Sequence, residues 1–221
     1  MTFRTDDGVH LEGELRIPDG PPRGSAVICH AHPGHGGSKD HPILWSVRNE
    51  LAGKRGLATL GFNFRGTMGS GGSFGSGRDE MHDVRAAVGF VRERADGPTL
   101  VFGWSFGASV ALREAFEDRR VSALALFGIP LRPNDLQLPP LPEPAELRRL
   151  KRPILFLAGE HDEYCSADEL RAYAHDLAEV VILEGTDHYL PRHERKAAAI
   201  VGDFADRLID ARGDRTRLPP E

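Results

Sequence analysis

The sequence has little cysteine, no long hydrophobic run and no repeated segment, and each of these absences narrows the class of protein. Two cysteines, Cys29 and Cys165, among 221 residues do not make the disulfide framework of a small secreted domain. No apolar run approaches the roughly 18 residues that a membrane-spanning helix requires. Neither heptads nor internal repeats are present, so the pattern indicates no coiled coil, and the oligomeric state stays open.

The chain also lacks an excess of basic residues. Its 28 lysines and arginines are outnumbered by 33 aspartates and glutamates, which gives a net charge of -5. The first 110 residues hold 12 of each sign, so neither half offers the positive surface that nucleic acid requires. The opening residues MTFRTDDGVHLEGEL carry charges where a signal peptide has its apolar core. We therefore expect a cytoplasmic protein that binds neither nucleic acid nor membranes.

Length and composition are those of one globular domain. A domain of this size buries roughly 70% of the surface of its unfolded chain, which is enough for one sizeable core. Hydrophobic residues make up 40% of the chain and charged residues 28%, as in ordinary soluble proteins. We expect a single domain over residues 1–221, in which the polar residues 212–221 form a flexible tail.

Short apolar runs alternate along the chain with longer segments of helical periodicity. Strands are expected at residues 9–17, 25–32, 57–64, 99–104, 121–129, 153–159 and 180–183. Helices are expected at residues 41–56, 79–95, 106–118, 166–178 and 191–211. This alternation predicts an α/β fold, a mostly parallel twisted sheet with helices on both faces. Ligands of such sheets bind beyond the carboxyl ends of the strands, so the loops there should hold the chemistry.

One of these loops reads Gly103-Trp104-Ser105-Phe106-Gly107, between an expected strand and an expected helix. This is the G-x-S-x-G pattern of a nucleophile elbow, a strained turn that projects a serine hydroxyl above the sheet. The glycines remove side chains that would collide in so tight a turn, and the helix N-terminus stabilises negative charge. The alternative is an ordinary turn that happens to contain a serine. The position after a strand and before a helix favours a catalytic Ser105.

A serine hydroxyl needs a base to act as a nucleophile, and in this arrangement the histidine comes last along the chain. Of the four histidines after Ser105, His188 lies in GTDHYLP, between the last expected strand and the last helix. His175 and His193 lie within helical patterns, and His161 lies among better candidates for the acid. The sequence therefore favours His188 as the base.

The third part of such a site is an acid that orients the imidazole of His188. Asp162 lies in AGEHDEY, just past an expected strand, in a loop with two neighbouring glutamates. Asp135, after the preceding strand, is the alternative. Asp187 adjoins His188 too closely in the sequence to reach its ring in the required geometry. We expect Asp162 to be the acid.

Taken together, these stretches resemble small α/β-hydrolases without a lid, related to dienelactone hydrolase and to small carboxylesterases. The resemblance covers nearly the whole chain and rests on CHAHPGHGG, FNFRGTMGSGGSF, GWSFG, GEHDEY and GTDHYLP. The more usual His-Pro-His-Pro of that group reads His30-Ala31-His32-Pro33 here. Dienelactone hydrolases proper use a cysteine nucleophile, so Ser105 favours an esterase-like activity instead.

The resemblance implies an oxyanion hole built from two backbone N–H groups. One belongs to Phe106, the residue after the nucleophile. The other belongs to His32 or to Gly34, because the proline between them has no N–H, and we favour His32. The resemblance also implies a structural role for Arg65, which we expect to pair with a carboxylate such as Asp83 and to brace the site.

Three histidines, His30, His32 and His35, have a spacing similar to that of the zinc ligands in metallo-β-lactamase-type hydrolases. Those enzymes have an aspartate before the last histidine, where this chain has Gly34, and they lack the alternation of strands and helices. A non-catalytic binding protein on a hydrolase fold is a third hypothesis, against which the complete serine, aspartate and histidine set argues. We therefore expect neither a metal nor another cofactor.

Many α/β-hydrolases insert a helical cap at the position that Ile129 to Arg152 occupies here. This segment is proline-rich, and only residues 143–150 are expected to form a short helix. An apolar face that could serve as a flap is offered by Leu131, Leu136, Leu138 and Leu141. So small an insert leaves a shallow, open site that buries few methylene groups of a substrate. Together with Ser105, Asp162 and His188, this predicts a serine hydrolase for carboxylic esters with short acyl groups. A thioesterase or a peptidase would use the same residues, so those activities stay open.

Overall fold

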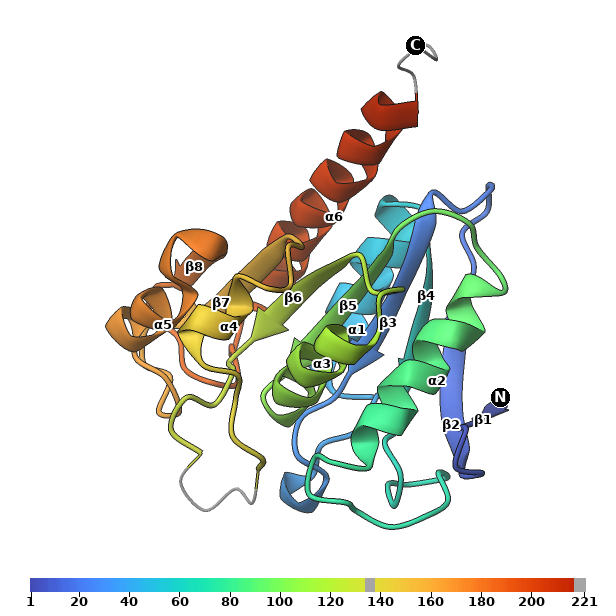
Figure 1. The fold of residues 1–221 in the computed structure, drawn as a ribbon, viewed down its shortest axis with the longest axis horizontal. Helices are drawn as coiled ribbons and strands as arrows, with labels where there is room; N and C mark the ends of the chain where they lie inside the picture. The colour runs from blue at the N-terminus through green and yellow to red at the C-terminus, as the bar shows by residue number, and fades with distance from the viewer. Residues whose placement is uncertain (134–137, 217–221) are drawn as a thin grey trace.

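The strands form one sheet in a computed structural model that describes residues 1–133 and 138–216 (Figure 1). They are β1 Thr2–Arg4, β2 His10–Arg16, β3 Gly24–Cys29, β4 Leu57–Phe62, β5 Thr99–Trp104, β6 Ala123–Phe127, β7 Ile154–Gly159 and β8 Glu179–Leu183. Their order in the sheet is β1-β2-β4-β3-β5-β6-β7-β8. β2 is antiparallel to both β1 and β4, and every other neighbouring pair is parallel. This confirms the mostly parallel sheet that the alternation predicts.

The hydrophobic pattern explains where each kind of strand lies. β2 alternates buried and partly exposed side chains, as an antiparallel strand near an edge does. The strands β3 to β7 are buried along their whole length. A strand that is covered on both faces needs a continuous apolar run, and runs such as TLVFGW and ALALF supply it.

Helices cover both faces of the sheet (Figure 1). They are α1 Pro42–Asn49, α2 Glu80–Arg92, α3 Phe106–Glu117, α4 Pro144–Leu147, α5 Ala167–Ala174 and α6 Glu194–Thr216. One core packs α1 and α6 on one face, through side chains such as Val47 and Val201. A second core packs α2, α3 and α5 on the other face, through side chains such as Val88 and Leu112. Loops lie at the carboxyl ends of the parallel strands.

Some boundaries differ from the expected ones. β1 is an additional strand, and α6 begins at Glu194 rather than Pro191. α6 also continues to Thr216, so it extends into the segment from residue 212 that the sequence predicts to be a tail. The short helix expected within residues 143–150 is α4, and between β6 and β7 the described residues contain no other helix. Asp135 and Leu136 lie outside the described residues.

None of the helices in the described part of the chain is long and apolar enough to cross a membrane.

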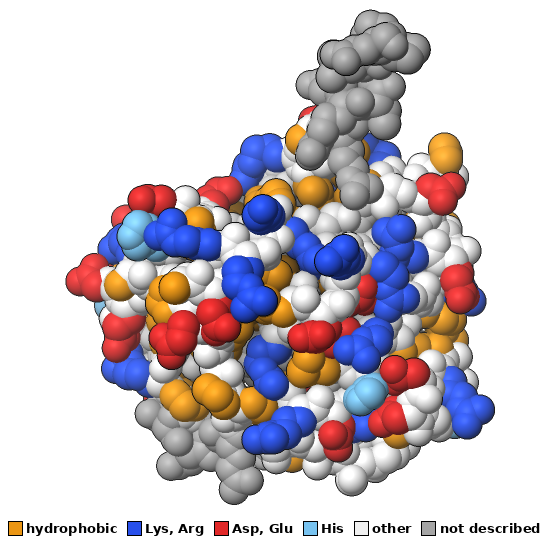
Figure 2. Space-filling view, viewed as in Figure 1, with side chains coloured by type: hydrophobic (Ala, Val, Ile, Leu, Met, Phe, Trp, Pro, Cys, Tyr) orange, Lys and Arg blue, Asp and Glu red, His pale blue; other side chains and the backbone are white. Residues whose placement is uncertain are grey.

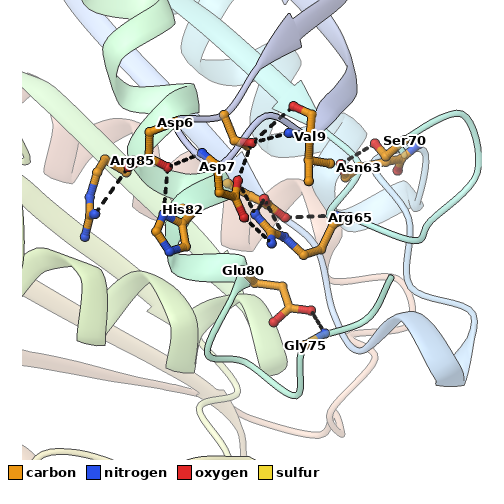
Figure 3. A network of polar contacts seen from close by, with 12 residues as sticks. Asp6, Asp7, Val9, Asn63, Arg65, Ser70, Gly75, Glu80, His82 and Arg85 are labelled. Atoms are coloured by element: carbon orange, nitrogen blue, oxygen red, sulfur yellow. Dashed lines mark hydrogen bonds and ion pairs between the residues drawn. The ribbon is translucent and has the colours of Figure 1, made fainter. Parts of the chain in front are cut away.

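Arg65 fastens the loop after β4 to the start of α2 and to the N-terminal segment (Figure 3). Its Nε and Nη2 donate to Oδ1 of Asp83 at 2.9 and 2.7 Å, and its backbone N–H donates to Oδ2 at 2.9 Å. Its Nη1 donates to Oδ2 of Asp7 at 2.8 Å. Burial raises the pKa of Asp83 to about 6, although the contacts with Arg65 act to lower it. The expected pairing of Arg65 with Asp83 is confirmed.

Candidate active site

Ser105 occupies the turn between β5 and α3, where its backbone has φ 55° and ψ -115°. Residues other than glycine rarely adopt this strained conformation, and such strain gathers at functional sites. A Cβ on Gly103 would lie 2.6 Å from Cα of Ala108, and one on Gly107 would lie 2.5 Å from the carbonyl oxygen of His30. Glycine is therefore required at both positions, as the G-x-S-x-G pattern predicts.

The loop after β8 places His188 against Asp162, which lies in the loop after β7. Nδ1 of His188 is 2.9 Å from Oδ2 of Asp162, and each residue is only 4% exposed. Oδ1 of Asp162 accepts from the backbone N–H of Tyr164 at 2.9 Å, and the carbonyl of His188 accepts from Nε1 of Trp104 at 3.2 Å. Because Nδ1–H donates to the carboxylate, the neutral ring keeps Nε2 unprotonated and able to accept a proton.

Ser105 and His188 line one pocket at the carboxyl edge of the sheet. The rest of its wall consists of Ala31, His32, His35, Gly36, Gly37, His41, Trp104, Tyr164 and Tyr189. Its volume is about 70 Å³, less than the ~150 Å³ of an engineered cavity that binds benzene. Most of the wall is aromatic or imidazole ring, and among the described residues no carboxylate lines it. The pocket therefore has room for a small group beside Ser105.

The alternative acids and bases lie elsewhere. Oδ1 of Asp187 accepts from the backbone N–H of Tyr189 at 2.8 Å, and Asp187 is exposed. His161 and His175 are exposed too, and neither lines the pocket. Asp135 lies outside the described residues. The structure thus brings together the serine, the histidine and the aspartate that the sequence favours.

Sequence reasoning missed Gly128, which follows β6 directly. Its φ is 55°, and a Cβ at this position would lie 2.8 Å from Cε1 of His188 and 3.2 Å from Oδ2 of Asp162. Any side chain here would displace the pair, so only glycine leaves room for it. A signal was present in the sequence, because a single glycine ends the apolar run ALALFG at the carboxyl end of a predicted strand.

His30 follows β3, is completely buried and has both ring nitrogens engaged by the backbone. Its Nε2 accepts from the N–H of Phe64 at 3.0 Å, and its Nδ1 donates to the carbonyl of Ala31 at 2.6 Å. Burial lowers the pKa of His30 to about 4, so the ring is neutral at pH 7. A ring with no free nitrogen cannot coordinate zinc, and the His30, His32 and His35 set therefore does not fit a zinc site.

The loop after β3 uses most of its backbone N–H groups internally. The N–H of Gly34 donates to Nδ1 of His32 at 3.0 Å. Those of His35 and Gly37 donate to the carbonyl of His32, both at 3.0 Å. The N–H of His32 has no such partner among the described residues. Phe106 begins α3, and the first N–H groups of a helix have no acceptor within it.

A model of the alpha/beta hydrolase domain matches residues 24–201 of the chain. An uncharacterized protein from Rickettsia prowazekii is 24% identical over an alignment of length 210, which covers 88% of this chain and 83% of that protein. The match to the domain model begins at β3 and includes the serine, the aspartate and the histidine described above.

Solved structures share the fold over nearly the full length. A protein of unknown function from Agrobacterium tumefaciens aligns with a TM-score of 0.81 and 22% identity, covering 100% of this chain and 99% of that one. An alpha-beta serine hydrolase homologue from Coxiella burnetii aligns with a TM-score of 0.75 and 24% identity, covering 96% and 95%. A serine hydrolase without a lid from Xanthomonas campestris aligns with a TM-score of 0.73 and 22% identity, covering 100% and 95%. Because the domain model matches most of the sequence, the chain belongs to the α/β-hydrolase family.

Proposed function

We propose that the protein is a serine hydrolase that cleaves carboxylic esters. The observation that carries the proposal is the bond between His188 and Asp162 beside a pocket that also holds Ser105 on a strained turn. A nucleophile, a base and an acid that orients the base are the parts that acyl transfer needs. Structures of similar fold include an esterase from Pyrococcus furiosus and Est1E of Butyrivibrio proteoclasticus with bound ferulic acid.

In the first half of the proposed reaction, Nε2 of His188 takes the hydroxyl proton as Oγ of Ser105 attacks the acyl carbon. The tetrahedral intermediate collapses when its bond to the alcohol oxygen breaks and His188 gives the proton to that oxygen. In the second half, His188 takes a proton from water, and the resulting hydroxide attacks the acyl-enzyme. The acid leaves, and His188 returns the proton to Ser105. Asp162 stays ionised throughout and stabilises the imidazolium.

The N–H groups of Phe106 and His32 stabilise the oxyanion in this proposal. The N–H of Phe106 lies at the N-terminus of α3, where the helix dipole favours negative charge. His32 is preferred to Gly34 because the N–H of Gly34 already donates to the His32 ring. Loss of one such donor raises the activation free energy by about 3 kcal/mol.

The size of the pocket supports a substrate with a short acyl group. A buried methylene contributes ~0.8 kcal/mol, but only where a wall covers it. The pocket of about 70 Å³ offers that wall to few carbon atoms. The short α4 is the only helix of the described residues between β6 and β7, so no helical cap deepens the pocket.

Kinetics of two serine variants test the proposal. Ser105→Ala removes the nucleophile and should abolish hydrolysis of p-nitrophenyl acetate. Ser109→Ala is the matched control, because Ser109 lies one turn further along α3 and its buried hydroxyl has no hydrogen-bond partner in the described part of the chain. We expect this control to keep the turnover of the unmodified protein. Wild-type turnover in folded Ser105→Ala would contradict the assignment.

A further inference from the structure

Three rings from different parts of the chain meet beside the pocket. The ring centroid of Phe74 lies 4.8 Å from that of His32 and 5.5 Å from that of Phe106. The centroids of His32 and Phe106 lie 5.4 Å apart. Phe74 belongs to the loop between β4 and α2, His32 to the loop after β3, and Phe106 to the start of α3. Each ring contacts both others, so the cluster links the two residues whose N–H groups are the proposed oxyanion donors.

The loop that carries Phe74 is fastened by hydrogen bonds just after this residue. The carboxylate of Glu80, completely buried at the start of α2, accepts from the N–H of Gly75 at 2.7 Å and of Gly77 at 2.8 Å. Figure 3 shows Glu80 facing Gly75. The backbone of Phe74 also lies close to Gly66, which has φ 72°, since a Cβ on Gly66 would lie 2.9 Å from the backbone nitrogen of Phe74. The bonds to Glu80 therefore fix the backbone just after Phe74, and the rings of His32 and Phe106 contact its side chain.

We propose that Phe74 is a positioning residue for the oxyanion hole, which fixes the His32 loop against the first turn of α3. The inference rests on the proposed function. Backbone N–H groups stabilise an oxyanion only when they point at the place that the oxygen takes in the transition state. A displacement of about 1 Å can cost on the order of 100-fold in rate. Phe74 is not among the described residues that line the pocket, so it acts through its two ring neighbours.

Because Phe74 is partly exposed, its effect on catalysis can be measured separately from any effect on folding. Phe74 is 38% exposed, so its truncation removes less buried surface than truncation of a core residue. Met68 lies in the same loop and is 75% exposed, which makes Met68→Ala the matched control. Phe74→Tyr keeps the ring and should keep its contacts with His32 and Phe106.

The experiment compares Phe74→Ala, Phe74→Tyr and Met68→Ala by hydrolysis of p-nitrophenyl acetate and by inhibition with a trifluoromethyl ketone. The ketone forms a tetrahedral adduct with a serine, and its oxyanion needs the same donors. For Phe74→Ala we expect kcat to fall about 10-fold and the inhibition constant to rise about 10-fold, with KM within about twofold. Phe74→Tyr and Met68→Ala should behave as the unmodified protein. A merely structural role would not move kcat and ketone affinity together at constant KM.

Labelling by a fluorophosphonate separates failure of this inference from failure of the proposed function. If the unmodified protein forms no adduct, the serine hydrolase assignment falls, and this inference falls with it. If the unmodified protein is labelled but Phe74→Ala matches Met68→Ala in labelling rate, kcat and ketone affinity, only the inference is overturned. Slower labelling of Phe74→Ala alone supports it.

Discussion

At the scale of single residues, the bond between Nδ1 of His188 and Oδ2 of Asp162 fixes which ring nitrogen is free to take a proton. Asp162→Asn replaces the acceptor with an amide that can donate, which favours the wrong tautomer of the ring. We expect kcat for ester hydrolysis to fall on the order of 10⁴-fold. Asp187→Asn, at an exposed neighbour of the histidine, and Asp135→Asn should leave kcat nearly unchanged. A dominant loss from Asp135→Asn, or small and equal losses from all three, would contradict the choice of acid.

Gly128 offers a second test at this scale. In Gly128→Ala the new Cβ would meet the ring of His188 at 2.8 Å, so the ring must shift away from its place in the pocket. We expect kcat to fall on the order of 100-fold, as for other misplaced catalytic groups. Gly185→Ala is the matched control, because φ is 68° there but no atom of the described residues lies within 4 Å of the added Cβ. Both variants should lose about 1 kcal/mol of unfolding free energy from backbone strain. Equal kcat in the two variants would show that Gly128 does not position His188.

At the scale of elements, we propose that the short segment between β6 and β7 limits the protein to substrates with short acyl groups. We expect kcat/KM to reach its maximum with short acyl chains when p-nitrophenyl esters from acetate to palmitate are compared, because the pocket buries few methylenes. A separate hollow borders this segment and is lined in part by Leu131, Leu138, Leu141 and Tyr173. A steady rise of kcat/KM towards palmitate would mean that this hollow takes the chain, and would contradict the short-chain proposal.

The elements were predictable where local sequence determines them. β5 lies at the residues that TLVFGW predicts, because a run of six mostly apolar residues after Gly97-Pro98 fits a buried strand and is too short for a buried helix. β1 was not predicted because Thr2–Arg4 has only three residues, too few to show a pattern. It forms a strand by pairing with β2, and Phe3 packs on Phe62. Pairing partners of this kind cannot be identified from periodicity.

In the candidate site too, features that local sequence determines could be predicted, and features that depend on distant contacts could not. Five consecutive residues were enough to propose Ser105 as the nucleophile, and chain order with loop position was enough to favour His188 and Asp162. Gly128 and the bond from Gly34 to His32 could not be foreseen. Gly128 must be glycine because the side chain of His188, 60 residues further along the chain, lies against it. The hydrogen bond from the N–H of Gly34 to Nδ1 of His32 depends on the orientation of the His32 ring, which cannot be deduced from the sequence pattern.

At the scale of the whole molecule, buried His30 makes stability depend on pH. Its pKa is about 4 in the folded protein, against 6.5 for an ordinary histidine. Between these values the unfolded chain binds more protons than the folded one, so stability is full above pH 6.5 and falls as the pH drops towards 4. We expect His30 to account for about 2 kcal/mol of lost unfolding free energy between pH 8 and pH 5.

Urea unfolding at these two pH values checks this expectation, with His30→Gln as the comparison. The variant should be less stable at pH 8, because it loses the bonds to Phe64 and Ala31. Its further loss on going to pH 5 should be smaller than that of the unmodified protein by about 2 kcal/mol. The same pH-dependent loss in both proteins would show that His30 is not the titrating group.

The central claim is that Ser105 is the nucleophile, and peptide mass spectrometry after fluorophosphonate treatment tests it most directly. The reagent phosphonylates an activated serine with loss of fluoride and needs no knowledge of the substrate. The account predicts one adduct, on the peptide that contains Ser105, with hydrolysis of p-nitrophenyl acetate lost in proportion to labelling. An unlabelled Ser105 in a protein that still hydrolyses the ester, or an adduct on another residue that tracks the loss of activity, would contradict it.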